Sequence, residues 1–259
     1  MSFFCIFGKK RKAEIVNIRI KLLPLPPISS LTSNFIMKKL MMMVVAALMA
    51  TVNANAQFEA GTFSLQPIVG CGAATITNAD NIDIAGKEQK NQFTVSAMTG
   101  VEAEYQISGN ISVAAGLNYT LQGTGWENYT KGGIKYKDPR MELGYVKIPL
   151  VVNCYVAKGL AIKAGVQFGF MTEAKMIMRN EFKEDRRDVT IDYSVDYKDD
   201  FEKFDLSIPF GVSYQFNNPF VIDARYQFGL TKLNKESGKG IKDLKNGVFM
   251  ITFGYKFAL

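Results

Sequence analysis

The sequence predicts an all-β protein, an eight-stranded antiparallel up-and-down transmembrane β-barrel behind an export signal. Three observations lead to this prediction: a secretory leader that ends near Gln57, eight segments of alternating apolar and polar residues, and connections that are long and short in turn. The 203 residues from Gln57 onward are enough for one domain. We therefore expect residues 57–259 to form the barrel.

Residues 37–56 have the three parts of a secretory signal peptide. Two lysines form a basic start, thirteen apolar residues follow, and Ala54-Asn55-Ala56 supplies a small-x-small pattern ahead of Gln57. The apolar stretch is shorter than the roughly 20 residues that a transmembrane helix needs. We expect cleavage between Ala56 and Gln57 rather than a membrane anchor.

Residues 1–36 hold a basic run, Lys9-Lys10-Arg11-Lys12, and no periodicity that would build a core. One interpretation is a nucleic-acid-binding arm. The other is that translation starts at Met37, because a signal peptide acts from the N-terminus. We favour the second and predict that residues 1–36 are a non-native, unstructured extension.

The basic character of the chain belongs to its first 56 residues. The net charge is +7, but eight of the 31 Lys and Arg residues and one of the 24 Asp and Glu residues precede Gln57. The predicted mature chain therefore has 23 of each and no net charge. Such a balance offers no case for a nucleic-acid partner.

Period-two alternation marks the predicted strands, each of which is long enough to cross a bilayer when tilted. In the clearest of them, large apolar residues at even positions from Phe204 to Phe216 alternate with small or polar residues. The expected strands are 62–72, 93–106, 110–122, 144–157, 160–172, 203–216, 219–231 and 247–258.

The connections favour a membrane barrel over a soluble, lipocalin-like barrel with its apolar face inward. Short turns at 107–109, 158–159 and 217–218 alternate with long segments. Outer-membrane barrels combine short periplasmic turns with long external loops, and an even strand number leaves no open edge. The long segments are 73–92, 123–143, 173–202 and 232–246.

The polar faces of the predicted strands carry four acidic and four basic residues. Equal numbers are expected where charges pair inside an enclosed lumen, whereas a soluble barrel tolerates any balance on its wet surface. The expected lumen charges are Glu102, Glu104, Lys147, Lys163, Asp205, Asp223, Arg225 and Lys256.

Aromatic residues gather at the ends of the apolar faces, for example Tyr105, Tyr119, Tyr214, Phe216 and Phe257. Interfacial girdles of membrane barrels have this placement. Phe257 lies in the last strand, where we expect the barrel-assembly machinery to bind during biogenesis.

Four short segments follow one another in a recognisable order: 143–153 (LGYVKIPLVVN), Phe204-Asp205 followed by Gly211, 225–230 (RYQFGL) and 254–257 (GYKF). Together they resemble the outer-membrane β-barrel family common in Bacteroidetes, labelled PorT-like or outer membrane protein beta-barrel domain. The resemblance implies an outer-membrane location and an eight-stranded barrel, and no particular activity. The protein that gives the PorT-like family its name is associated with secretion and gliding machinery, so the resemblance implies a secretion-related role only remotely.

The sequence shows little chemistry. It contains no histidine, which excludes Ser-His and Cys-His nucleophile pairs and His-based metal sites. Glu102 and Glu104 lie two residues apart and could support a carboxylate mechanism, but we expect them to pair with lumen bases. Cys71 and Cys154 lie on apolar faces of strands that are not neighbours, so we expect free thiols. We predict no catalytic residue, no cofactor and no metal.

Two long segments are candidate binding regions. Segment 173–202 holds ten acidic and six basic residues, which suits a hard-cation site, a contact with lipopolysaccharide through divalent ions, or simply a solvated charged loop. We favour the solvated loop, because the spacing matches no calcium-loop pattern. Segment 123–143 holds Trp126, Tyr129 and Tyr136, which could stack on a glycan or lie at the membrane surface.

Eight strands enclose a lumen that side chains can fill. We therefore predict a plugged, non-enzymatic barrel in the outer membrane of a Gram-negative bacterium, which serves envelope structure, surface interaction or an envelope assembly. The alternatives are a narrow channel, a histidine-free surface enzyme and a secreted soluble binder. The expected partners are outer-membrane lipid, lipopolysaccharide and unidentified envelope proteins.

Overall fold

The computed structural model describes residues 15–20, 59–79, 82–83, 88–184, 187–235 and 243–259. Across these ranges, no helix is both long and apolar enough to pass through a membrane. The predicted signal peptide and its cleavage residues Ala54, Ala56 and Gln57 lie outside the described residues.

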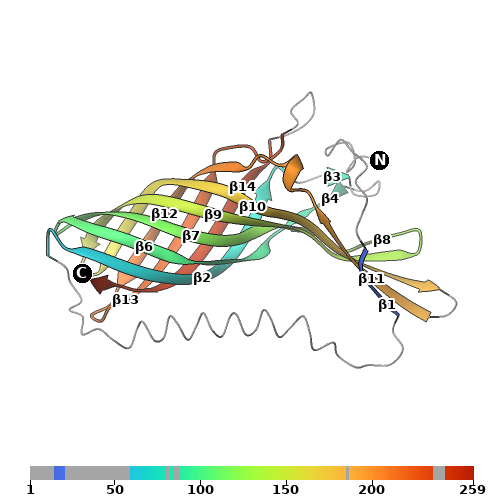
Figure 1. The fold of residues 1–259 in the computed structure, drawn as a ribbon, viewed down its shortest axis with the longest axis horizontal. Coiled ribbons are helices and arrows are strands. Elements are labelled where there is room, and N and C mark those ends of the chain that lie inside the picture. Colours follow the sequence, from blue (N-terminus) through green and yellow to red (C-terminus); the bar gives the residue numbers. More distant parts are fainter. Residues whose placement is uncertain (1–14, 21–58, 80–81, 84–87, 185–186, 236–242) are drawn as a thin grey trace.

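Eight antiparallel strands form a ring (Figure 1). They pair in the order β10-β12-β13-β14-β2-β6-β7-β9, and β9 pairs with β10 to complete the ring. The predicted all-β, eight-stranded antiparallel barrel is confirmed. The strands are β2 (Phe63–Thr77), β6 (Thr94–Ser108), β7 (Ile111–Trp126), β9 (Ile134–Ala157), β10 (Leu160–Glu184), β12 (Phe204–Gln215), β13 (Phe220–Gly229) and β14 (Lys245–Tyr255).

Alternation along each strand places large apolar side chains outside the ring and polar side chains inside. In β12, Ile208 and Phe210 are 39% and 52% exposed, whereas Asp205 and Ser207 are each 1% exposed. Similar apolar side chains cover the outside of the other seven strands. An outer surface of this kind suits lipid rather than water.

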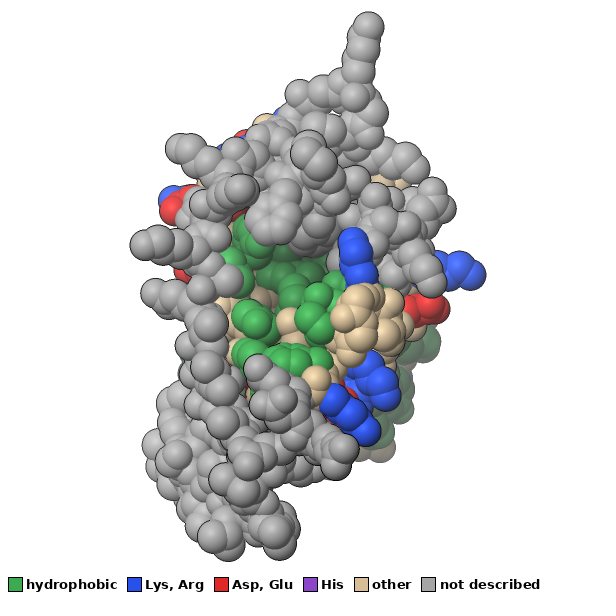
Figure 2. All heavy atoms as spheres, turned by 90° about the vertical axis from the view of Figure 1, so that its right-hand side faces the viewer, with side chains coloured by type: hydrophobic (Ala, Val, Ile, Leu, Met, Phe, Trp, Pro, Cys, Tyr) green, Lys and Arg blue, Asp and Glu red, His purple; other side chains and the backbone are tan. Residues whose placement is uncertain are grey.

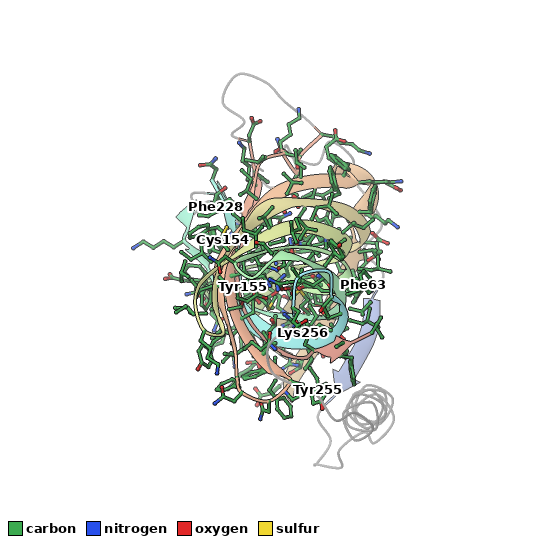
Figure 3. All side chains as sticks on the ribbon, turned by 90° about the vertical axis from the view of Figure 1, so that its left-hand side faces the viewer. Phe63, Cys154, Tyr155, Phe228, Tyr255 and Lys256 are labelled. Carbon is green, nitrogen blue, oxygen red and sulfur yellow. The ribbon has the colours of Figure 1, made fainter. Side chains whose placement is uncertain are left out.

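The view along the ring separates the two faces clearly (Figure 3). Tyr155 and Lys256 lie inside the ring, and Phe63 and Cys154 lie on its outside. Cys154 and Cys71 are free, exposed thiols on β9 and β2, which are not neighbouring strands, as the sequence predicts.

Short turns join the strands at one end of the ring, which we call the turn end. The turns join β6 to β7, β9 to β10 and β12 to β13, and the C-terminal strand β15 (Phe257–Ala258) pairs with β2 at the same end. Gly159 in the β9–β10 turn has a φ of +75°, which glycine adopts without the steric penalty of a side chain.

At the opposite end, the extended end, the strands run further than the sequence predicts (Figure 1). β10 has 25 residues, and at roughly 3.3 Å per residue it is about 80 Å long. It forms a hairpin with β11 (Arg187–Asp196), followed by the short 3-10 helix η1 (Lys198–Asp200). The prediction of a loop over 173–202 was therefore wrong. Alternation continues there, but most outer-face positions are now charged or polar, and Ile177 is an apolar exception on β10.

The predicted loop 123–143 is also largely β-structure, because β7 and β9 extend into it and β8 (Tyr129–Lys131) pairs with β9. Short strands β3 (Ile82–Asp83), β4 (Glu88–Gln89) and β5 (Asn91–Gln92) lie between β2 and β6. Strand β1 (Ile15–Ile20) pairs with β11, which differs from the expectation of no structure in residues 1–36. The segment IVNIRI, rich in β-branched residues, pairs with the edge of β11 that does not contact β10.

Candidate functional site in the barrel lumen

The inner face of the ring carries polar side chains in layers that follow one another from the turn end towards the extended end. The strands alternate in direction, so residues from both ends of the sequence meet in one layer. All eight charged residues predicted for the lumen are buried, with exposed fractions between 1% and 7%.

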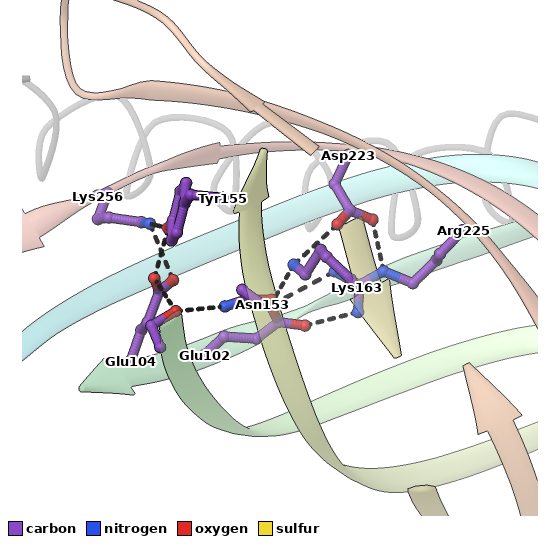
Figure 4. Close-up of polar contacts among 9 residues, drawn as sticks. Glu102, Glu104, Asn153, Tyr155, Lys163, Asp223, Arg225 and Lys256 are labelled. Carbon is purple, nitrogen blue, oxygen red and sulfur yellow. Dashed lines mark hydrogen bonds and ion pairs between the residues drawn. The ribbon is translucent and has the colours of Figure 1, made fainter. Parts of the chain in front are cut away.

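The first layer is built around Glu104 on β6 (Figure 4). One carboxylate oxygen of Glu104 accepts hydrogen bonds from the hydroxyls of Tyr155 (2.6 Å) and Ser112 (2.7 Å). The other oxygen accepts from Lys256 Nζ at 2.8 Å. Asn153 donates to Ser112 at 2.9 Å and extends the layer to β9. Both carboxylate oxygens of Glu104 therefore have partners.

The second layer is a four-charge network on β6, β10 and β13 (Figure 4). Arg225 donates from Nη1 to Glu102 at 2.7 Å and from Nε to Asp223 at 2.6 Å. Lys163 Nζ lies 2.8 Å from Asp223 and 3.8 Å from Glu102. Two carboxylates thus face two cations, so the layer has no net charge and spans the lumen from β6 to β13.

The third layer holds charges without an ion-pair partner within 4 Å among the described residues. Lys147 Nζ donates to the side-chain carbonyls of Gln122 and Gln227, each at 2.7 Å. Gln167 donates to Gln227 at 2.9 Å. Nearer the extended end, Asp205 accepts a hydrogen bond from Asn246 at 2.9 Å.

The sequence did not indicate the neutral partners of these charges. Tyr155, Gln167 and Gln227 lie on the inward register of predicted strands, which is the signal that could have identified them. Asn246 lies in β14 but falls just before the predicted eighth strand, in a segment that was expected to be a loop. Several buried polar atoms have no partner within the described part of the chain, among them both amide atoms of Asn118. Buried groups of this kind are commonly satisfied by ordered water.

An apolar cluster closes the lumen near the extended end, where the sequence predicted only a polar interior. Trp126 and Leu143 are 4% and 0% exposed within it. Figure 2, a view onto this end, shows hydrophobic side chains gathered at the centre of the face. The buried members are Ile76, Ala79, Trp126, Met141, Leu143, Tyr145, Met171, Ala174, Met176, Phe201, Leu233 and Leu244.

A cavity of about 640 Å³ opens at the turn end. Gln106, Tyr155 and Gln215 line its inner part, and turn residues such as Asn110 and Lys158 line its rim. Because Tyr155 also contacts Glu104, the first polar layer forms the inner boundary of this cavity.

Beyond the ring, β11, β10, β9 and β8 form a sheet with two different faces, which we call the external sheet. Ion pairs Arg179–Asp192 (2.7 Å) and Lys137–Glu181 (2.8 Å) lie on its outer face. On β8 and β9, Tyr129 stacks on Tyr136 with ring centroids 4.5 Å apart. Burial, together with Tyr136 nearby, raises the pKa of Tyr129 to about 12. Tyr129 therefore stays neutral at physiological pH.

Within the described residues, no group of three or more Cys, Asp or Glu side chains is arranged to hold a metal ion. Glu102 and Glu104, the two carboxylates considered for catalysis, are each engaged with a base.

A ring of eight antiparallel strands with an apolar outside, a polar inside and short turns at one end defines an outer-membrane β-barrel. The chain belongs to the family described as outer membrane protein beta-barrel domain, whose model matches residues 53–235. The protein accordingly lies in the outer membrane of a Gram-negative bacterium. In such barrels the short turns face the periplasm, so the extended end faces outward.

Solved structures with similar folds include three outer-membrane proteins. Ail, the attachment invasion locus protein of Yersinia pestis, shares 16% identity over 76% of this chain and 99% of its own, with a TM-score of 0.38. OprG from Pseudomonas aeruginosa shares 16% identity over 80% of this chain and 100% of its own, with a TM-score of 0.38. Neisserial surface protein A shares 15% identity over 75% of this chain and 97% of its own, with a TM-score of 0.38. These similarities concern the fold alone. No curated protein matches the chain.

Proposed function

We propose that the protein is a plugged, non-enzymatic barrel that holds its external sheet at the cell surface, for envelope structure, surface interaction or an envelope assembly. The observation that carries this proposal is the filled lumen. The charge network of Glu102, Lys163, Asp223 and Arg225 spans the interior, and the apolar cluster around Trp126 and Leu143 fills the outer part.

Because the lumen is filled, the surface available for interactions lies outside the membrane. The lipid-facing belt on β10 ends at Phe170, and charged residues such as Lys175 and Arg179 follow on the outer face. Paired charges immediately beyond the belt, including Arg140–Glu142 (2.7 Å), suit contact with the phosphates and divalent ions of lipopolysaccharide. Envelope proteins are the other proposed partners.

The proposal of a non-enzymatic role rests on the absence of histidine and on the ion pairs of the lumen carboxylates. A general base must reach a substrate proton. Glu102 and Glu104 are at most 7% exposed and lie below the apolar cluster, out of reach from the cell surface.

We also propose that residues 37–56 direct export and are removed before Gln57, and that residues 1–36 do not belong to the mature protein. The three-part pattern ending in Ala54-Asn55-Ala56 supports this. The short segments that resemble PorT-like barrels of Bacteroidetes support membership of that group, and a secretion-related assembly is the role that this resemblance suggests.

A narrow channel is the second candidate. It is favoured by the turn-end cavity of about 640 Å³ and by the buried polar atoms without partners, such as those of Asn118, which suit a hydrated path. The apolar cluster opposes it, because water and ions would have to cross a dry segment.

Planar-bilayer recordings distinguish the two candidates. We expect no single-channel steps from the plugged barrel, and no change in Lys163→Gln or in the external control Lys175→Gln. Discrete steps whose cation preference shifts in Lys163→Gln, and not in Lys175→Gln, would contradict the proposal and establish the channel.

A further inference from the structure

Strand β11 is the outermost strand of the external sheet, and its outer edge is occupied by an unexpected partner. Its inner edge pairs with β10 in ten consecutive residue pairs without a bulge. Its outer edge pairs with β1, in the register Ile18↔Ile191 and Ile20↔Val189. β1 belongs to residues 1–36, which we have proposed are absent from the mature protein.

Removal of β1 would leave the outer edge of β11 open, since no other described strand pairs with that edge. An edge strand presents a row of backbone N–H and C=O groups to any extended chain. Protective devices of natural edges include short length, charged side chains, proline and bulges. β11 has the charges, at Asp188, Asp192 and Asp196, and these disfavour an acidic segment but not a basic one. β11 has ten residues, no proline and no bulge in its pairing with β10.

The two faces of β11 specify the side chains of a segment that adds to this edge. Val189, Ile191, Tyr193 and Val195 share the inner face, and Val189 is 8% exposed. Asp188, Asp192 and Asp196 share the outer face with Thr190 and Ser194. In an antiparallel pair, directly opposed residues share a face. Apolar residues of the segment would therefore extend the inner face, and basic residues would lie beside the aspartates.

We propose that the outer edge of β11 binds an extended polypeptide segment from a partner protein by β-strand addition, and that the segment alternates apolar and basic residues. The inference rests on the proposed removal of residues 1–56. Segment 173–202 has ten acidic and six basic residues, so its charge complements a basic partner. Main-chain hydrogen bonds give affinity in this mode of recognition, and alternate side chains give specificity.

A second copy of the same strand fits this edge less well than a basic segment. Antiparallel pairing of two β11 strands would bring the three aspartates of each strand onto one face. Like charges at cross-strand positions are destabilising. The edge is thus selective for a heterologous segment.

The probe is a fluorescent peptide of residues 13–22, which contains β1, and the structure gives the register of Ile15–Ile20 on β11. It is added to the barrel that begins at Gln57, held in lipid nanodiscs, and anisotropy is measured. We expect saturable binding, no binding of a scrambled peptide, and at least about tenfold weaker binding to Asp188→Asn/Asp192→Asn. The matched control Glu127→Gln/Asp138→Asn removes two exposed acidic charges away from the β11 edge and should bind normally.

Two peptides methylated on alternate backbone nitrogens test the mode of binding. Methylation along the edge that faces β11 removes hydrogen-bond donors and should weaken binding by about tenfold or more, while methylation along the opposite edge should not. Equal binding of both peptides would overturn strand addition. Dimerisation of the barrel through β11, with no peptide binding, would overturn the heterologous partner.

Cysteine pairing separates this inference from the proposed processing. In a background without native cysteines (Cys5→Ala where residues 1–56 are present, Cys71→Ala and Cys154→Ala), Ile191→Cys should form a disulfide with a peptide carrying Ile18→Cys, and not with one carrying Asn17→Cys. If the protein in the outer membrane keeps residues 1–56, the same pair should form within one chain; that result contradicts processing and leaves the edge pairing intact. If Ile18→Cys forms no disulfide with Ile191→Cys, either as a separate peptide or within one chain, the inference is contradicted.

Discussion

At the scale of single residues, the lumen is organised by charge balance. Arg225 alone would be a buried cation, and it is tolerated because Glu102 and Asp223 both lie within 2.7 Å of its guanidinium. Lys163 supplies the fourth charge and makes the network neutral. Removal of one member of a buried ionic group leaves an uncompensated charge, which costs more than the group contributes when intact.

Neutralisation of Glu102 tests this balance. We expect Glu102→Gln to lower the free energy of unfolding by about 3–5 kcal/mol, because Asp223 alone would face two cations. The double variant Glu102→Gln/Lys163→Met, which keeps the Asp223–Arg225 pair, should recover most of that loss. Urea unfolding in lipid vesicles can be followed by the fluorescence of Trp126, the single tryptophan of the chain.

The control for this experiment is Glu142→Gln, which removes the half-exposed Arg140–Glu142 pair and should cost about 1 kcal/mol or less. A double variant no more stable than Glu102→Gln would show that the individual contacts of Glu102, rather than net charge, stabilise the lumen.

The sequence predicts which residues enter the lumen better than it predicts their partners. Alternation gives the inward register of Glu104 and Lys256 without reference to other strands. Their pairing depends on the stagger of β6 against β14, which are separated by β2 in the ring. Stagger arises from closure of the whole sheet. The same limit applies to Lys147, whose neutral partners lie on β7 and β13.

At the scale of elements, the eight strands follow the alternation of apolar and polar residues. The predicted strand ends are wrong where the outward residues change from apolar to charged. On β10, the outward positions are apolar up to Phe170 and, apart from Ile177, charged from Lys175 onward. The sequence interpretation ended the strand at this change. Charged residues remain compatible with β-structure in water, where cross-strand pairs such as Arg179–Asp192 support the hairpin.

The change on β10 also marks the outer boundary of the membrane belt, so the hairpin beyond it should be dispensable for folding. Tyr193 pairs with Met178, so residues 179–192 can be replaced by Asn-Gly, which suits a two-residue turn. We expect this variant to insert and to unfold within about 1 kcal/mol of the parent, because it loses few buried apolar contacts.

The contrasting variant is Leu150→Lys, which places a charge on the lipid face of β9, where Leu150 is 45% exposed. It should cost about 2–4 kcal/mol. If the hairpin deletion proves as damaging as Leu150→Lys, the external sheet is part of the folding unit, and the boundary at Phe170 is misplaced.

At the scale of the whole molecule, closure of the ring determines how the protein unfolds. Each of the eight strands has two neighbours, and the β9–β10 pairing joins strands that are also consecutive in sequence. No ring strand can leave without breaking two ladders of hydrogen bonds, so unfolding should be cooperative. Residues 57–259 carry no net charge and the lumen is filled, so neither adds repulsion that would open the ring.

Cooperative closure predicts heat-modifiable mobility on SDS gels. Unboiled protein from the outer-membrane fraction should migrate as a compact species and shift to one slower band on boiling. We expect no band for a partly opened barrel, because loss of one strand pairing exposes backbone groups that lipid cannot satisfy. N-terminal sequencing of the same band should begin at Gln57. The hairpin deletion is the control for ring closure and should shift in the same way. A ladder of intermediate bands would show that the ring opens strand by strand, and identical mobility before and after boiling would contradict a closed ring.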